Sequence, residues 1–244
     1  MSSIKIKNYS IYNAPLEDIS INNSKKKLVI NTINAHSYIV AKTDLKFQEA
    51  LLESHILLLD GEGIVFYAKQ VHNEKIKKIA GADIHEYLLE QANANKLKCF
   101  YLGSSQNTLD LIKIKLSEKY PNIEFGFFSP PFKAEFSEYD NQKMISETNA
   151  FQPDIVFVGM TAPKQEKWVF EHRNHINANV ICSIGAVFDF IAETKKRAPQ
   201  WMIDAKLEWF YRSFTAWRLT KRYLYSTPLF LLEVYKNKLF SKAG

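Results

Sequence analysis

The carboxylate of Asp60 is the first side chain in this sequence that could do chemistry. It ends the apolar run at residues 55–59, and Gly61 follows it directly. A carboxylate at the tip of a buried strand is partly desolvated, which raises its pKa and makes it a better general base. Asp is also a favoured helix N-cap, so the pattern leaves a base and a cap equally open.

Two smaller polar residues, Thr32 and Asn34, follow another apolar run at residues 28–31. If the two runs are neighbouring strands, these side chains emerge beside Asp60 and could hydrogen-bond a sugar or acceptor hydroxyl. They could equally cap the helix that follows.

Two strand-to-helix turns could receive phosphate groups. Leu102-Gly103-Ser104-Ser105 has a glycine at the turn, but it lacks the further glycines of a dinucleotide fingerprint. Pro163-Lys164-Gln165-Glu166 follows the apolar run at residues 155–159 and opens a helix, where backbone N–H groups, a lysine and an amide suit a diphosphate leaving group. A proline-started helix with exposed polar residues explains the second turn as well.

A last candidate acid, Asp189, lies in Gly185-Ala-Val-Phe-Asp-Phe190, after the final predicted strand. It could accept hydrogen bonds from ribose hydroxyls or a uracil N–H, or it could pair with Lys195 or Arg197. The sequence has no Asp-x-Asp, and His172 and His175 have no carboxylate in a convincing arrangement, so we expect chemistry without a metal.

The elements that must position these residues alternate in type along the chain. Apolar runs predict strands at residues 28–31, 55–59, 97–102, 123–127, 155–159 and 180–184. Between them, helices are expected at residues 35–54 with a break near Thr43, and at 82–93, 108–119, 138–149 and 165–175. This alternation predicts an α/β, Rossmann-like fold with a mainly parallel sheet covered on both faces, whose ligands bind at the carboxyl ends of the strands.

The charge is concentrated in the last fifth of the chain. Residues 195–244 carry eleven Lys and Arg side chains against three acids, and three of the four tryptophans of the chain. A helical region is expected at residues 200–242, interrupted near Pro228. We predict a catalytic domain at residues 1–194 and a basic, aromatic appendage at 195–244 that meets an anionic membrane surface or phosphates. Docking of its aromatic side chains onto the body is the plainer alternative.

We expect the protein to stay in the cytoplasm. The polar N-terminus lacks the apolar core of a signal peptide, and no run reaches the roughly 20 apolar residues of a membrane span. Cys99 and Cys182 lie in apolar runs and are expected to be buried small hydrophobes.

Eight segments stand in order along the chain: Asn31-Thr-Ile-Asn34, Leu59-Asp-Gly-Glu-Gly63, Ala80-Gly-Ala-Asp83, Tyr101-Leu-Gly103, Ala162-Pro-Lys-Gln-Glu-Lys-Trp168, Ile184-Gly-Ala-Val-Phe-Asp-Phe190, Lys196-Arg-Ala-Pro199 and Leu207-Glu-Trp-Phe-Tyr-Arg212. Together they resemble the WecG/TagA/CpsF family of bacterial glycosyltransferases, glycosyltransferase family 26, whose members build surface polysaccharides and wall teichoic acid. The resemblance covers residues 28–225 approximately.

The resemblance implies an inverting transfer, without metal or cofactor, from a UDP-sugar to an undecaprenyl-diphosphate-linked sugar at the inner face of the plasma membrane. It places the catalytic base at Asp60, pocket residues at Thr32 and Asn34, and the active-site amide at Gln165. The appendage begins near Arg197, and the cations that grip the acceptor diphosphate correspond most nearly to Arg212, Arg218 and Lys221. We expect Arg222, which follows Lys221, to join them. An arginine usual in the family is Lys78 here, and another is Lys221; each keeps the charge but loses the bidentate fork.

Two other functions remain as alternatives. A nucleotide-binding Rossmann protein, such as an oxidoreductase, needs a Gly-x-Gly-x-x-Gly after its first strand, which Asn31-Thr-Ile-Asn-Ala lacks. A non-enzymatic module that uses the basic tail on membrane or RNA leaves the polar residues after five strands unexplained, so we expect no nucleic-acid partner. The sequence leaves open the donor sugar, whether N-acetylmannosamine, its uronic acid or glucose, and whether the chain forms a homo-oligomer.

Overall fold

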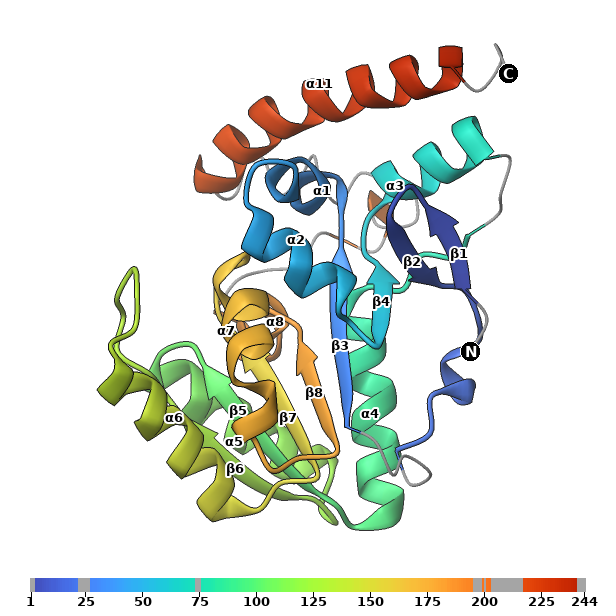
Figure 1. The fold of residues 1–244 in the computed structure, drawn as a ribbon. Helices are drawn as coiled ribbons and strands as arrows, with labels where there is room; N and C mark the ends of the chain where they lie inside the picture. Colours follow the sequence, from blue (N-terminus) through green and yellow to red (C-terminus); the bar gives the residue numbers. More distant parts are fainter. Residues whose placement is uncertain are drawn as a thin grey trace.

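A six-stranded parallel sheet forms the centre of the molecule (Figure 1). The structure, a computed structural model, describes residues 3–21, 27–72, 76–194, 199, 201–202 and 217–240, and the side chains of 71–72, 217–224 and 239–240 lie outside this description. The strand order is β4-β3-β8-β7-β5-β6, and every pair is parallel. The strands are β3 (Leu28–Ile33), β4 (Ile56–Leu59), β5 (Lys98–Gly103), β6 (Glu124–Phe128), β7 (Ile155–Gly159) and β8 (Val180–Ser183).

Helices cover both faces of the sheet, which confirms the predicted α/β, Rossmann-like fold. Each of the six predicted strands exists within two residues of its expected ends, and the long first helix is broken in two near Thr43 as predicted. The covering helices are α1 (Ala35–Ala41), α2 (Leu45–Leu52), α3 (Glu62–Tyr67), which runs into the π-helix η2 (Ala68–His72), α4 (Gly81–Asn95), α5 (Gln106–Lys119), α6 (Glu138–Phe151), α7 (Lys164–His172) and α8 (Val187–Ile191).

Local sequence signals begin several of these helices. Asp44 accepts a hydrogen bond from the Phe47 N–H at the start of α2, and Ser105 accepts one from Thr108 at the start of α5. Ser137 and Asp140 form a reciprocal capping box at the start of α6. Such caps satisfy backbone N–H groups that have no partner inside the helix.

The core has two layers because the sheet is buried on both faces. One layer holds side chains of α4, α5 and α8 against the sheet, and the other holds those of α6 and α7. Strands buried on both sides need uninterrupted apolar runs, which explains why the sequence shows runs rather than alternation. Cys99 and Cys182 are buried and unpaired in this core, as expected, and burial raises the pKa of both thiols.

An N-terminal hairpin of β1 (Ser3–Ile6) and β2 (Tyr9–Tyr12) packs beside the β4 edge and was not predicted. The described part also contains two short 3-10 helices, η1 (Leu16–Asp18) and η3 (Arg173–His175). The polar character of the first residues conceals the hairpin, because only its inward-facing side chains are apolar.

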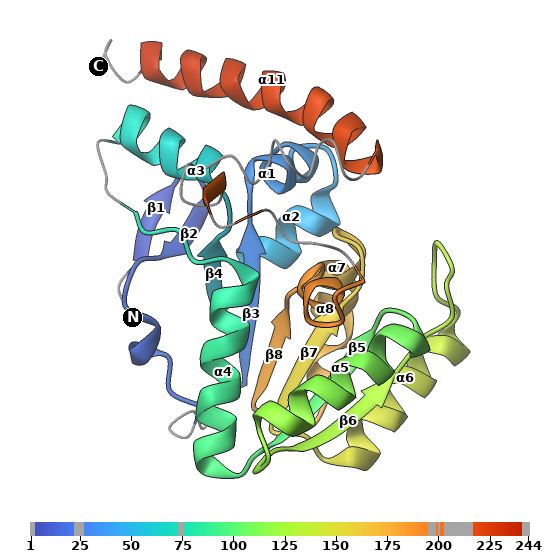
Figure 2. The same cartoon turned by 180° about the vertical axis from the view of Figure 1, so that it is seen from behind.

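The C-terminal helix α11 (Trp217–Phe240) lies across the carboxyl end of the sheet, above α1 and α3 (Figures 1 and 2). It continues through Pro228, so the predicted interruption there is wrong. Proline lacks an N–H and crowds the preceding turn, yet Pro228 is exposed, while Ser226 and Phe230 on either side are buried. Packing on both sides of the proline therefore keeps the helix continuous.

The chain leaves neighbouring strands β3 and β8 toward opposite faces of the sheet. α1 and α2 follow β3 on the face that carries α7, whereas α8 follows β8 on the face that carries α4 and α5. The carboxyl ends of these two strands therefore form the topological switch point, where open α/β sheets bind ligands.

Candidate active site

The ends of β3 and β4 bring the first three predicted site residues together. The strands are in register at Ile33 and Leu59, and the Asp60 N–H donates to the Ile33 carbonyl at 2.9 Å. Thr32 is the penultimate residue of β3 and is half-buried. Asn34 follows the same strand, and a Cβ built on Gly61 would lie 3.6 Å from the Asn34 Cβ.

The structure shows which of these residues cap a helix at this edge of the sheet. Asn34 is the N-cap of α1, because its Oδ1 accepts from the Ser37 N–H at 3.0 Å. The N-cap of α3 is Gly61, with a φ of 111° that favours glycine, and α3 has no side-chain cap. Asp60 is half-buried and does not cap α3, so the cap interpretation is wrong and its role as a base stays a prediction.

Lys78 lies next to this group. The Ile79 N–H donates to the Leu59 carbonyl at 2.9 Å, so the segment before α4 runs along the end of β4. A Cβ built on Gly81, at the start of α4, would lie 3.5 Å from the Ile184 carbonyl oxygen after β8. This segment therefore connects the Asp60 end of the sheet with the loop that follows β8.

Gly103 has a structural reason to be glycine. Its φ is 133°, and a Cβ there would lie 2.3 Å from the Gly159 carbonyl oxygen of the neighbouring strand β7. That oxygen accepts from the Ser104 N–H at 3.0 Å. The glycine lets the ends of β5 and β7 approach each other, and its predicted role beside a phosphate stays a prediction.

The first turn of α7 holds Lys164, Gln165 and Glu166, and the preceding Ala162–Pro163 peptide bond is cis. The Lys164 ammonium is 2.5 Å from the Lys133 carbonyl oxygen and 3.4 Å from the centre of the Phe136 ring. Partial burial lowers the pKa of Lys164. In this structure the lysine is thus turned toward the loop before α6.

Gln165 and Glu166, in the first turn of α7, are buried, whereas the plainer interpretation expected exposed polar residues there. The Gln165 Nε2 donates to the Glu166 Oε1 at 2.8 Å, and the Gln165 Oε1 accepts from the Met160 N–H at 3.1 Å. A Cβ built on Gly185, after β8, would lie 3.4 Å from the Gln165 Nε2. The amide is therefore at the switch point.

Asp189 lies in α8 and is half-buried. Its backbone carbonyl accepts from the Thr194 hydroxyl at 3.2 Å. Lys195 and Arg197, the proposed structural partners of its carboxylate, lie outside the described residues, so both interpretations of Asp189 remain predictions.

The predicted acceptor cations fall mainly outside the description. Arg197 and Arg212 are not among the described residues, and Arg218, Lys221 and Arg222 lie on α11 without described side chains. Of the helices that the structure describes, none is both long and apolar enough to span a membrane.

The described half of α11 is tied to the body close to Asp60. Phe230 packs between the rings of Tyr38 and Tyr67, and a Cβ on Gly63 would lie 3.5 Å from the Phe230 Cε1. The Glu233 carboxylate binds Lys7 of the hairpin at 2.5 Å and Lys42 after α1 at 2.8 Å. Sequence analysis missed this connection, because nothing local links residues so far apart in the chain.

Two buried polar side chains near the switch point were also missed. Asn31 Oδ1 and Ser183 Oγ are buried and have no hydrogen-bond partner among the described residues. Ile30 of β3 pairs with Cys182 of β8. Asn31 and Ser183 are the next residues along these two neighbouring strands. The available signal was a polar residue late in each apolar run, and buried polar groups of this kind commonly hold water.

A metal centre is not evident in the described part of the chain. No group of three or more His, Cys, Asp or Glu side chains gathers there. His172 stacks on Trp168 at 5.1 Å between ring centres, and burial lowers its pKa. The expectation of metal-independent chemistry remains a prediction.

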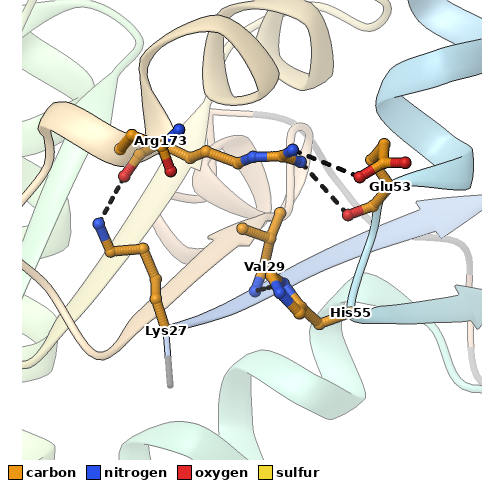
Figure 3. Close-up of a pocket in the computed structure, with 6 residues that line it drawn as sticks. Lys27, Val29, Glu53, His55 and Arg173 are labelled. Carbon is orange, nitrogen blue, oxygen red and sulfur yellow. Dashed lines mark hydrogen bonds and ion pairs between the residues drawn. The ribbon is translucent and has the colours of Figure 1, made fainter. Parts of the chain in front are cut away.

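A depression of about 320 Å³ lies at the opposite end of the strands (Figure 3). Its charged side chains are engaged with the protein itself. Lys27 donates to the Arg173 carbonyl at 2.5 Å, Arg173 donates to the Glu53 carbonyl at 3.3 Å, and the Val29 N–H donates to His55 Nδ1 at 3.1 Å. These contacts join α2, β3 and the end of α7, which is a structural role.

Comparison with known proteins identifies a family and several relatives. A sequence model described as the Glycosyl transferase WecG/TagA/CpsF family matches residues 2–244. Similar proteins include the N-acetylglucosaminyldiphosphoundecaprenol N-acetyl-beta-D-mannosaminyltransferases of Staphylococcus aureus strains NCTC 8325 / PS 47, COL and MRSA252. Each is 29% identical to the chain over 217 residues, which cover 89% of this chain and 83% of the relative.

Proposed function

The chain belongs to the WecG/TagA/CpsF family of glycosyl transferases, and from this premise we propose that it moves a sugar from a UDP-sugar to an undecaprenyl-diphosphate-linked sugar. The transfer inverts the anomeric carbon and needs no metal and no cofactor besides the donor substrate. Its place is in the synthesis of teichoic acid or another cell-envelope polysaccharide. N-acetylmannosamine is the first donor sugar to test, because the relatives are named for its transfer.

The position of Asp60 carries the proposal. It follows β4 at the carboxyl edge of the sheet, beside Asn34 and the Lys78 segment, and it does not cap a helix. In the proposed reaction its carboxylate takes the proton from the acceptor hydroxyl as that oxygen attacks the anomeric carbon, while the bond to UDP breaks. A positioned general base of this kind typically contributes about 10²- to 10⁴-fold to the rate.

The departing diphosphate needs positive partners where a metal would act in other enzymes. The start of α7 supplies a helix N-terminus without a side-chain cap, and Lys78 and Lys164 supply cations near the same edge. Lys164 would exchange its contact with the Lys133 carbonyl for a phosphate oxygen. We assign Thr32, Asn34, Gly103 and Asp189 to contacts with the donor.

The basic tail is the proposed holder of the lipid-linked acceptor. Arg197, Arg212, Arg218, Lys221 and Arg222 would meet the acceptor diphosphate and anionic lipid. The described half of α11 supports this arrangement, because its exposed face is apolar while its other face docks beside Asp60. The side chains of that outer face are Tyr225, Leu229, Leu231, Leu232 and Tyr235. We therefore place the enzyme peripherally on the inner face of the plasma membrane.

The test is a donor screen with a synthetic prenyl-diphosphate-N-acetylglucosamine acceptor. UDP-N-acetylmannosamine, its uronic acid and UDP-glucose are offered separately, with and without EDTA, and products are identified by mass. We expect one donor to be transferred at a rate that EDTA leaves unchanged. Absence of transfer from every UDP-sugar would contradict the proposed donor class, and loss of activity in EDTA would contradict the metal-free mechanism.

A further inference from the structure

Two adjacent polar side chains at the start of α7 are almost completely buried. Gln165 is 3% exposed and Glu166 is 2% exposed. A carboxylate is rarely buried to this extent without a specific partner, because removing its charge from water is costly. The contacts of Glu166 therefore need a functional or structural explanation.

The orientation of the Gln165 amide follows from its backbone contact. The Met160 N–H can only donate, so the atom 3.1 Å away must be the amide oxygen. The amide nitrogen then faces the other way, where it donates to the Glu166 Oε1 at 2.8 Å. A hydrogen bond to a carboxylate is about twice as strong as a neutral one, so Glu166 fixes this orientation more firmly than a neutral partner would.

The second hydrogen of this amide has no acceptor among the residues that the structure describes. The amide lies against Gly185, after β8, where an added Cβ would be 3.4 Å from Nε2 and 3.5 Å from Oε1. Glycine leaves this side of the amide without a covering side chain. The loop after β8 borders the switch point, so a ligand in the crevice can approach the amide there.

We propose that Glu166 is a positioning residue of the sugar-transfer site. Its carboxylate holds the Gln165 amide so that the second amide hydrogen is presented to an oxygen of the bound donor. The inference rests on the proposed function, which makes Gln165 a substrate contact. A hydrogen-bond donor that is fixed in place before the substrate binds needs no reorganisation during the reaction. This is the advantage of holding the Gln165 amide with a buried charge.

A purely structural role makes different predictions. An acid in the first turn of a helix stabilises it through the helix dipole, and Glu166 occupies that turn of α7. In that case its replacement would lower the melting temperature and leave the kinetics of the folded enzyme unchanged.

The decisive variant is Glu166→Gln, which keeps the size of the side chain and removes its charge. We expect kcat/KM for the donor to fall about 10- to 100-fold, as for a small misplacement of a positioning group, with a melting temperature close to that of the wild type. Glu171→Gln is the matched control: it makes the same change on the same helix, at an exposed carboxylate that pairs with Lys46. Wild-type kcat/KM in Glu166→Gln would overturn the proposal.

A double-mutant cycle tests whether Glu166 acts through Gln165. Gln165→Ala alone should lose activity, and adding Glu166→Gln to it should cause no further loss in kcat/KM. Independent, multiplying losses would overturn the positioning role. If Glu166→Gln folds poorly, the exchange Gln165→Glu/Glu166→Gln keeps an amide–carboxylate pair; we expect it to fold and remain inactive, and wild-type activity would contradict the proposal.

A spectroscopic readout separates this inference from the proposed function. The side-chain amide signals of Gln165, identified in a ¹⁵N-labelled sample by their loss in Gln165→Ala, should shift in Glu166→Gln and stay in place in Glu171→Gln. Unshifted signals would overturn the positioning role whether or not the enzyme transfers sugar. If the signals shift in Glu166→Gln but the wild-type protein transfers no sugar, the result would contradict the proposed function alone.

Discussion

Single side chains near the switch point differ in whether the fold already uses them. The amide oxygen of Asn34 accepts the Ser37 N–H as a helix cap, and the ammonium of Lys164 donates to a backbone carbonyl. Asp60 directly follows β4, as Asn34 follows β3, but it does not cap the helix that comes next. The N-cap of that helix is Gly61, so the role of Asp60 as a helix cap is ruled out, while its role as a base stays a prediction.

Replacing Asp60 by Asn should remove the base and keep the shape. We expect kcat for sugar transfer to fall by about 10²- to 10⁴-fold with donor affinity nearly unchanged, because the amide cannot accept the proton. Transfer rates and UDP-sugar binding are measured on the same preparation. Near wild-type transfer would show that the base is another residue.

His85 is a second residue with a measurable consequence, here for stability. Its Nε2 lies 2.6 Å from the Tyr101 hydroxyl, and complete burial, followed by repulsion from Lys119, lowers its pKa to about 3. The unfolded chain binds a proton near the ordinary pKa of about 6.5, so stability falls as the pH drops from 6.5 toward 3.

The expected loss from this group is about 1.4 kcal/mol for each pH unit within that window. Urea unfolding between pH 5 and 6.5 measures it, since the carboxylate of Glu233, whose ion pairs outweigh burial and lower its pKa to about 2, matters only at lower pH. His85→Phe/Tyr101→Phe removes both polar partners and should reduce the slope, with a residual slope left by His172, whose pKa is also lowered. An equal slope in the variant and the wild type would contradict the assignment.

At the scale of elements, α11 depends on the body for its position. An isolated helix with Pro228 in its interior is unfavourable by about 3 kcal/mol, so docking of Phe230, Glu233 and Val234 has to offset that cost. The docked face contacts α1 and the segment around Gly63, three residues after Asp60. The appendage and the predicted base are thus parts of one packed unit.

Phe230→Ala should loosen this packing. Removing a buried phenylalanine typically costs about 3 to 5 kcal/mol, and the loss falls here on the contact between α11 and the body. We expect faster proteolytic cleavage within α11 and slower sugar transfer. Tyr235→Ala, on the exposed side of the same helix, is the control. Equal cleavage of the two variants would show that Phe230 does not hold the helix.

At the scale of the whole molecule, the proposed membrane contact combines the outer face of α11 with the charge of the tail. Exposed apolar side chains on a basic helix favour the interface of an anionic membrane. Residues 195–244 supply the basic charge, while the preceding part of the chain is close to neutral. Because α11 lies across the carboxyl end of the sheet (Figure 1), the proposed active site would face the same side as the proposed membrane contact.

Vesicle sedimentation tests this orientation. The protein should bind vesicles that contain phosphatidylglycerol, with binding that weakens as salt is raised, because the attraction is partly electrostatic. Leu232→Ser/Tyr235→Ser should reduce binding, whereas Ile114→Ser, an equally exposed apolar site on α5, should not. Equal binding of the two variants would place the membrane contact elsewhere on the molecule.

The sequence by itself determined the parallel sheet, its strands within two residues, the split first helix and the order of the family segments. These features follow from local patterns: apolar runs, caps and turns act within a few residues. The same patterns placed Asp60, Thr32 and Asn34 at strand ends, but they left base and cap undecided for the first and hydroxyl contact and cap undecided for the others.

Only the tertiary structure showed that Asn34 caps its helix and that Asp60 does not cap α3; the catalytic and binding roles stay predictions. The other features that only the structure shows depend on residues that are distant in the chain. The burial of Gln165 and Glu166 requires the sheet beneath α7, and the close approach of Gly103 to Gly159 requires two strands side by side. The hold of Lys7 and Lys42 on Glu233, and with it a helix that continues through Pro228, spans nearly the whole sequence. Contacts of this kind form only when the chain has folded, so no local pattern contains them.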